Sequence, residues 1–210
     1  MANDMRADLE KLVQRLREAF DDYAREGGMF DESTPSRPHP PAAVKEIDAF
    51  EKKMGWKFPA SYRDFLTLHN GWERYASVFT LIGVGGKHTT KAQKQIKETL
   101  SLYKGIWEEK HGKATDARIK EFESKANRSG KTEDDARIYI ANKLVFGTSS
   151  SGSLRLFNPA VTDKAGEPEV VYRDQLGEIV RRYPNFRAML EADLAFYEGE
   201  VASQKKEKKA

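Results

Sequence analysis

Residues 41–72 constrain the fold of this chain most strongly, because they predict two amphipathic helices with well-marked ends. Gly55 is placed for the left-handed C-terminal cap of the first helix, and Pro59 suits the first turn of the second. The pair Asn70-Gly71 then ends the second helix. The apolar stripes that we expect to face a core are Val44, Ile47, Phe50 and Met54, followed by Tyr62, Phe65, Leu66 and His69. Both helices should therefore pack on an element that follows them.

The composition allows one sizeable domain, with or without accessory elements, in 210 residues. The chain has no cysteine, which excludes disulfides, a thiolate nucleophile and zinc–thiolate ligation. Its first residues lack the basic-then-apolar pattern of a secretory signal, and no apolar run approaches the roughly 18 residues that span a bilayer. We therefore expect a cytoplasmic location and no membrane partner.

Patterns along the chain predict four regions, of which only one is a full domain. These regions are an N-terminal amphipathic helix over residues 1–30, a Pro-rich linker over 31–41, a folded domain over 42–200 with a helical insertion at about 87–135, and a Lys-rich tail over 201–210. The prolines of the linker are expected to keep it out of both helix and strand. The tail is expected to be frayed and solvated.

The folded domain combines strand patterns with helices at both ends. Residues 79–84 predict a first strand entered through 72–75, and the insertion should lie against the sheet or its edge. Later strands are predicted at 144–147, 152–157, 169–172 and 177–180, and a last helix over 186–197. This order favours an α+β fold with a largely antiparallel multi-stranded sheet and helices on one face, plus the N-terminal helix and the insertion.

Two glycine-rich segments resemble chemical motifs but lack essential parts. Residues 147–153 have the glycine spacing of a phosphate-binding loop, yet Ser153 stands where the lysine is required, so a polar hairpin turn is expected. Residues 83–86 are expected to be only a strand exit, without the helix of a dinucleotide fold.

The histidines and carboxylates suggest no catalytic set. No two of the four histidines stand four residues apart, and none lies in a carboxylate cluster, so a metal site is poorly supported. His69 lies on an apolar stripe, where a hydrogen-bonded, half-buried ring is favoured over a catalytic role. We expect no cofactor, no metal and no enzymatic activity.

The sequence pattern of the two helices resembles that of the SUKH superfamily, which includes a regulator of yeast cell-wall synthesis and many bacterial proteins. The resemblance rests on Glu51, Gly55, Phe58, Pro59, Tyr62, Phe65, Asn70 and Gly71, in that order. The hairpin at 144–157, the strands at 169–172 and 177–180 and the helix from Tyr183 also resemble the family, so that coverage runs from about Pro40 to Tyr197. The resemblance implies that Glu51, Gly55 and the other matched positions define the fold rather than a site.

The resemblance also implies a protein-binding function. Many bacterial members look like immunity proteins that bind and neutralise toxins, often nucleases or deaminases, by stoichiometric occlusion. The first hypothesis is therefore a cytosolic immunity protein whose partner is a cognate protein toxin. The alternative is a regulatory scaffold that binds endogenous signalling or cell-wall-synthesis proteins. Eukaryotic members of this second kind usually carry long disordered flanks, which are short in this chain.

A third hypothesis is weak nucleic-acid binding through residues 87–131, which hold twelve bases against six acids. No aromatic-rich recognition motif accompanies these bases, so nucleic acid is a disfavoured partner, and a solvated helix face is the favoured interpretation of them.

Large aromatic and acidic side chains provide the candidate partner-binding residues. The candidates are Trp72, Glu73, Tyr75, Tyr103, Trp107, Asp134 and Asp135. Tryptophan and tyrosine suit an interface anchor, although burial in the core is the competing and favoured interpretation for all four aromatic residues. The acids can face a basic partner or lie in solvated loops.

Overall fold

The computed structural model describes residues 2–27, 36–76, 78–121 and 144–208 of the chain. Its centre is a seven-stranded sheet in which every neighbouring pair is antiparallel and the strands follow their sequence order. The strands are β1 (Arg37–Pro38), β2 (Trp72–Tyr75), β3 (Phe79–Leu81), β4 (Leu144–Ser149), β5 (Leu154–Thr162), β6 (Pro168–Arg173) and β7 (Ile179–Tyr183). The helices are α1 (Ala2–Arg25), α2 (Val44–Met54), α3 (Ala60–Leu68), α4 (Gly86–His111) and α7 (Phe186–Glu207), and residues 116–121 are also helical. The expected α+β fold is confirmed.

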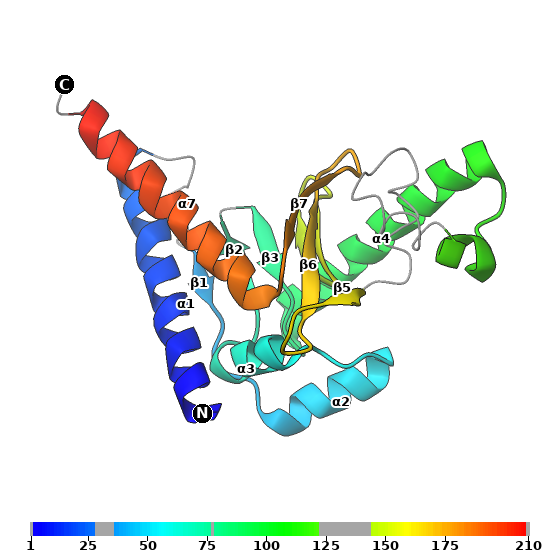
Figure 1. Cartoon of the computed structure of the whole chain (residues 1–210), viewed down its shortest axis with the longest axis horizontal. Coiled ribbons are helices and arrows are strands. Elements are labelled where there is room, and N and C mark those ends of the chain that lie inside the picture. The colour runs from blue at the N-terminus through cyan, green and yellow to red at the C-terminus, as the bar shows by residue number, and fades with distance from the viewer. Residues whose placement is uncertain (1, 28–35, 77, 122–143, 209–210) are drawn as a thin grey trace.

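Helices cover both faces of the sheet. Helices α1, α3 and α7 lie on one face, whereas the inserted helix α4 lies on the other (Figure 1). The alternation of side chains along the strands explains this division. Arg155 of β5 points to Asp193 of α7, and Arg173 of β6 lies 5.5 Å from the ring centre of Tyr103 on α4. The expected insertion on the connection between β3 and β4 thus forms a layer of its own.

An aromatic cluster joins α3 and α7 to the middle of the sheet. The fully buried ring of Tyr62 lies 5.2 Å from Phe146, 5.5 Å from Phe157 and 5.0 Å from Phe186, measured between ring centres. These contacts are edge-on, an arrangement that adds about 0.5–1.5 kcal/mol per pair beyond area burial. The hydroxyl of Tyr62 donates a 2.7 Å hydrogen bond to the carbonyl oxygen of Ile82, so its polar end is satisfied inside the core.

The turn between α2 and α3 is organised by a buried carboxylate. Glu51 is 2 % exposed, and its side chain accepts hydrogen bonds from the backbone N–H of Phe58 at 2.8 Å and from Arg63 at 2.6 Å. Gly55 adopts φ 69°, the left-handed C-terminal cap that the sequence predicts. The apolar stripe of α2 is narrower than expected, because Val44 and Met54 are 55 % and 40 % exposed.

The Asn70-Gly71 pair connects the end of α3 to the exit of β3. The Asn70 side-chain oxygen accepts a 2.7 Å hydrogen bond from the backbone N–H of Val84. Gly71 has φ 83°, and a Cβ atom there would lie 2.7 Å from both Gly83 N and Leu81 O. Only glycine fits this position without moving backbone.

The linker prediction is wrong at residues 37–38, which form the edge strand β1. Pro38 pairs with Trp72 of the neighbouring strand β2, and the Trp72 indole N–H donates a 2.8 Å hydrogen bond to Ser36 Oγ. Proline is tolerated on an edge strand because its missing N–H faces away from the ladder. Residues 72–75, expected only as an entry to the first strand, form β2 itself.

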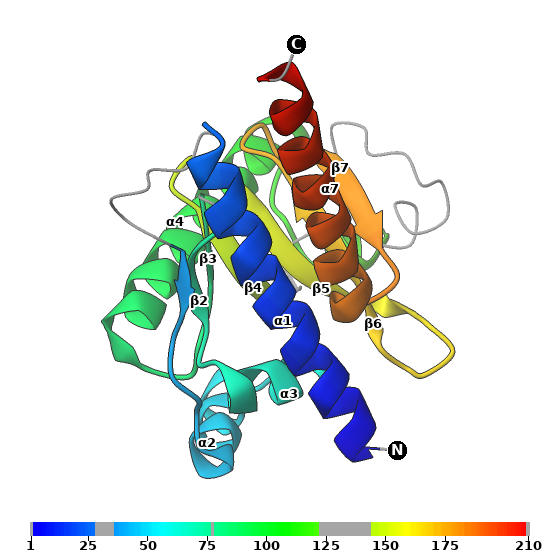
Figure 2. The ribbon, with the colours of Figure 1, turned by 90° about the vertical axis from the view of Figure 1, so that its left-hand side faces the viewer.

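The C-terminal Lys-rich tail is not frayed over its described part, because α7 continues to Glu207. Lys208 lies 2.9 Å from Glu26 and Lys205 lies 3.9 Å from the same carboxylate, just beyond the end of α1. Figure 2 shows α1 and α7 side by side in front of the sheet, with their C-terminal ends close together. Within the described residues, no helix combines the length and apolar character needed to cross a bilayer.

Candidate functional site

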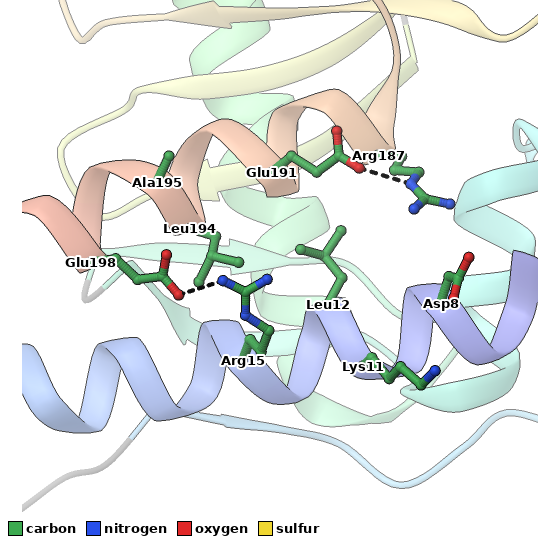
Figure 3. Close-up of a pocket in the computed structure, with 9 residues that line it drawn as sticks. All are labelled: Asp8, Lys11, Leu12, Arg15, Arg187, Glu191, Leu194, Ala195 and Glu198. Carbon is green, nitrogen blue, oxygen red and sulfur yellow. Dashed lines mark hydrogen bonds and ion pairs between the residues drawn. The ribbon is translucent and has the colours of Figure 1, made fainter.

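The groove between α1 and α7 is the first candidate site, with a cavity of about 590 Å³ (Figure 3). Leu12 and Leu194 contribute its apolar surface, while charged side chains of both signs stand along the two helices. Arg15 crosses the groove to pair with Glu198 at 2.7 Å, and Arg187 pairs with Glu191 at 2.9 Å on α7. The remaining lining residues are Asp8, Lys11 and Ala195. The groove therefore offers balanced charge rather than a field of one sign.

A second cavity of about 660 Å³ lies between α1 and the end of α3. His69 lines it together with residues of α1, which are Ala7, Glu10, Lys11, Gln14, Arg15 and Arg17. The Nδ1 atom of His69 lies 3.3 Å from the carbonyl oxygen of His39, and burial lowers the pKa of the His69 ring. This half-buried, hydrogen-bonded ring agrees with the structural role favoured by the sequence.

The most deeply buried charges form a network between β5 and α7. Arg155 donates a 2.7 Å hydrogen bond to Asp193, and the Tyr75 hydroxyl donates a 2.6 Å bond to the same carboxylate oxygen. Burial disfavours the charged form of Arg155, but the Asp193 carboxylate outweighs it and raises the Arg155 pKa. Burial, together with the Asp193 charge, raises the pKa of Tyr75 well above its usual value. Arg155 is thus held in its charged form and Tyr75 in its neutral form, as expected beside a buried structural ion pair.

Two histidines and a glutamate meet where β1, β2 and α4 come together. The rings of His39 and His88 are stacked with their centres 3.7 Å apart, and His39 Nε2 lies 3.2 Å from a carboxylate oxygen of Glu73. Burial, and the adjacent His39, lower the pKa of His88. Because the two rings are stacked, the lone pairs of their nitrogen atoms lie in separate planes and do not converge on one metal position. In the part of the chain that is described, no group of three or more histidine or acidic residues is arranged to hold a metal ion.

The expected polar hairpin turn is confirmed between β4 and β5. The Ser153 N–H donates to Ser149 Oγ at 3.0 Å, and the segment continues into a strand instead of a helix. The second glycine segment departs from expectation, because α4 begins directly at Gly86. Its backbone donors are already used: Gly83 N–H bonds to Thr89 Oγ1 at 3.0 Å and Val84 N–H to Asn70 Oδ1. These two donors therefore do not point to a phosphate.

The four aromatic candidates for partner binding lie inside the molecule, on opposite sides of the sheet. Trp72 and Tyr75 are fully buried on β2, and Tyr103 and Trp107 on α4 are 3 % and 2 % exposed. The Tyr103 hydroxyl lies 3.2 Å from the carbonyl oxygens of Asp174 and Gln175. The competing core interpretation therefore describes all four positions, and their side chains offer almost no surface to a partner.

The acidic candidates divide differently. The Glu73 side chain is 48 % exposed beside His39, so it is available for contact. Asp134 and Asp135 lie outside the described residues. A partner-binding role for these residues stays a prediction. Among the described candidates, Glu73 is the residue whose side chain is exposed enough for direct contact with a partner.

Sequence reasoning missed the groove that the fold creates between the remote helices α1 and α7. The α1–α7 groove joins residues about 180 positions apart, and no local sequence pattern predicts that these two helices lie side by side. The outward side of α4 carries a weak signal, since Lys87, Lys91 and Lys94 recur at helical spacing.

Comparison with known families then identifies the domain that carries these surfaces. The sequence model of the SMI1 / KNR4 family (SUKH-1) matches residues 41–192, well over half of the chain. The chain belongs to the SMI1 / KNR4 family. The matched range takes in α2, α3, the seven-stranded sheet except its first strand, and the first turns of α7. Helix α1 lies outside the SMI1 / KNR4 match, and α4 stands in it as the expected insertion. A comparison with curated proteins gives no match.

Proposed function

We propose that this SMI1 / KNR4 chain is a non-catalytic, cytoplasmic protein-binding protein that acts as an immunity protein. It binds a cognate bacterial toxin of nuclease or deaminase type and neutralises it by covering its active surface. Family membership over residues 41–192 is the observation that carries this proposal. The resemblance of the sequence to bacterial immunity proteins supports the biological role in this proposal.

The chemistry of the described residues supports occlusion rather than turnover. The buried carboxylates Glu51 and Asp193 are each held by an arginine at 2.6–2.7 Å, so both serve the fold. His69 and His88 are hydrogen-bonded to backbone carbonyl oxygens at 3.3 and 3.2 Å, and in the described part of the chain neither ring is hydrogen-bonded to a nucleophilic side chain. A protein that blocks a toxin needs a rigid surface, and the seven-stranded sheet provides the frame for one.

The experiment is co-expression with the C-terminal toxin domain encoded by the adjacent upstream gene. Growth rescue and recovery of a one-to-one complex would support the immunity function. The matched control is the destabilised variant Asp193→Asn. Its growth rescue should fall only as far as its amount of soluble protein falls, because the change lies in the core and not on a binding surface. Capture of endogenous signalling or cell-wall enzymes, without rescue, would instead support the scaffold alternative and overturn the immunity proposal.

A further inference from the structure

A short segment over residues 36–40, which we call the strap, closes one edge of the sheet. Its strand β1 has two residues, one of them a proline, and pairs with β2 (Figure 1). Beyond the strand, the His39 N–H donates a 3.0 Å hydrogen bond to Gly71 O, and the Asn70 N–H donates a 3.0 Å bond to Pro40 O. A two-residue ladder that contains a proline is weak by itself, so side-chain contacts matter for how firmly the strap is held.

The ring of His39 fastens the strap to the first turn of α4. It stacks on the ring of His88, with 3.7 Å between the ring centres and 17° between the ring planes. His88 is the third residue of α4, and its Nε2 atom lies 3.2 Å from the carbonyl oxygen of Asn70. An Nε2–H donor satisfies this contact, so the His88 ring is fully bonded in its neutral form.

The charged groups around the stacked pair favour one added proton over two. Glu73 on β2 is the adjacent carboxylate, 3.2 Å from Nε2 of His39. The charges along α4 have the opposite sign, because Lys87 and Lys91 flank His88 in sequence and the positive end of the helix dipole lies at this first turn. Burial and a charge on the His39 ring lower the pKa of His88, and the Glu73 charge opposes them.

His69, at the end of α3, holds the strap in a different way. Its Nδ1 atom lies 3.3 Å from the carbonyl oxygen of His39, and the charges that act on its ring are Arg17 and Glu10 of α1, one of each sign. An Nδ1–H donor is present both in the charged ring and in the neutral tautomer that makes this bond. Protonation of His69 therefore leaves its hold on the strap in place.

We propose that the stacked His39–His88 pair is a proton-controlled latch, which keeps the strap closed while at most one ring is charged and releases it when both are charged. In the doubly charged state two imidazolium rings would face each other at 3.7 Å beside the single carboxylate of Glu73. Like charges at this separation repel, and the short strand β1 opposes them weakly. Release frees the backbone edge of β2 and separates Ser36 from the indole of Trp72. The latch requires no toxin, because every group in it belongs to this chain.

Hydrogen exchange of single amides tests the latch, read by NMR on the full chain at pH 7.5 and 5.5 and corrected for the intrinsic exchange rate at each pH. The His39 and Asn70 amides report on the closed strap, and the Ile82 amide, bonded to Phe146 O at 2.8 Å, reports on the sheet. An opening that takes up one proton shifts by up to tenfold per pH unit. We therefore expect the protection of the two strap amides to fall about tenfold or more at pH 5.5, while Ile82 stays protected.

The decisive variant is His88→Gln, with His69→Gln as the matched control. The glutamine amide can still donate to Asn70 O but takes up no proton, so the ratio of protection between the two pH values should approach one. His69→Gln removes a half-buried histidine of lowered pKa that lies outside the stack, and the ratio should stay as in the wild type. Glu73→Gln keeps both rings but removes the charge that favours their protonation, so the opening should move to lower pH.

Four results would overturn the latch. The wild-type strap amides could keep their protection at pH 5.5, or His88→Gln could lose protection as strongly as the wild type. An equal fall at Ile82 would make the loosening global, and loss of the pH dependence in His69→Gln would move the sensor to the end of α3. Because Glu73→Gln leaves the stack intact, its shift in opening pH supports the latch even where His88→Gln loosens the strap at both pH values.

Discussion

At the scale of single residues, backbone conformation and close contact can be separated with two glycines. Gly71 and Gly55 both have positive φ, at 83° and 69°, but only Gly71 faces backbone atoms at 2.7 Å. A side chain at Gly55 meets nothing within 4 Å and so adds only conformational strain. The contacts at Gly71 fix the spacing between the end of α3 and the exit of β3.

We therefore predict that Gly71→Ala destabilises the fold by about 3 kcal/mol or more, because it combines left-handed strain with displacement of backbone. Gly55→Ala should cost about 1–2 kcal/mol, the strain alone. Urea unfolding of both variants, followed by circular dichroism, measures the difference. Equal losses would show that the contact at Gly71 relaxes at no cost.

The buried pair of Arg155 and Asp193 allows a second prediction at this scale. Asp193→Asn keeps the shape of the side chain but leaves the Arg155 charge buried without its counter-ion, which should lower the free energy of unfolding by about 3–5 kcal/mol. Glu191→Gln, two residues earlier on α7, removes an exposed pair with Arg187 and should cost less than about 1 kcal/mol. Denaturant titration tests both, and a loss for Asp193→Asn no larger than that of Glu191→Gln would contradict the argument.

At the scale of elements, local signals account for α2 and α3 and fail for the edge of the sheet. Gly55, Pro59 and Asn70-Gly71 mark helix ends through interactions a few residues long, so the sequence predicts them correctly. Strand β1 has two residues, one of them proline, and exists only because β2 lies beside it. The long extension of α7 likewise has no local signal in the sequence, and its lysines meet Glu26 of a remote segment.

The junction of β1, β2 and α4 leads to a pH prediction. Burial lowers the pKa of His88, and burial also lowers that of His69, so the unfolded chain binds protons more readily than the folded chain at both positions. Their contribution to stability is complete above the usual histidine pKa of 6.5 and is lost as the pH falls through the lowered values. The thermal midpoint should therefore fall as the pH is lowered.

Thermal unfolding between about pH 5.5 and 7.5 measures this effect, because histidine is the side chain that titrates in that range. His88→Gln should reduce the slope of midpoint against pH, and His69→Gln/His88→Gln should reduce it further. An unchanged slope in the double variant would contradict the assignment of the pH dependence to His69 and His88.

At the scale of the whole molecule, the sequence identifies the helices and most strands but not which of them pack together. The aromatic residues Trp72 and Tyr75 suit an interface as well as a core, and only the position of α1 decides between these roles. Phe20 of α1 lies 5.7 Å from Trp72, 5.4 Å from Tyr75 and 4.8 Å from Tyr197 of α7, between ring centres. No pattern in residues 1–30 reveals these neighbours, since helical periodicity defines an apolar side but not what covers it. The side of the sheet that α4 covers is undetermined for the same reason.

The expected N-terminal region is therefore part of one core, and its removal should be severe. A chain lacking residues 1–27 loses Leu16 and Phe20, both at most 1 % exposed, and uncovers Trp72, Tyr75 and Tyr197. Burial of one such large side chain contributes about 1.5–3 kcal/mol, so the combined loss rivals the 5–15 kcal/mol stability of a typical domain. We expect the truncated chain to lose the near-ultraviolet circular dichroism of its aromatic residues and to aggregate.

A chain that ends after Gln204 is the matched control, because it removes Lys205 and Lys208, whose solvent-exposed pairs with Glu26 are expected to contribute little to stability. It should retain the near-ultraviolet spectrum and the cooperative unfolding transition of the full chain. If the chain without residues 1–27 kept both properties as well, α1 would be an accessory, and Trp72 and Tyr75 would become accessible to a partner whenever that helix moved away.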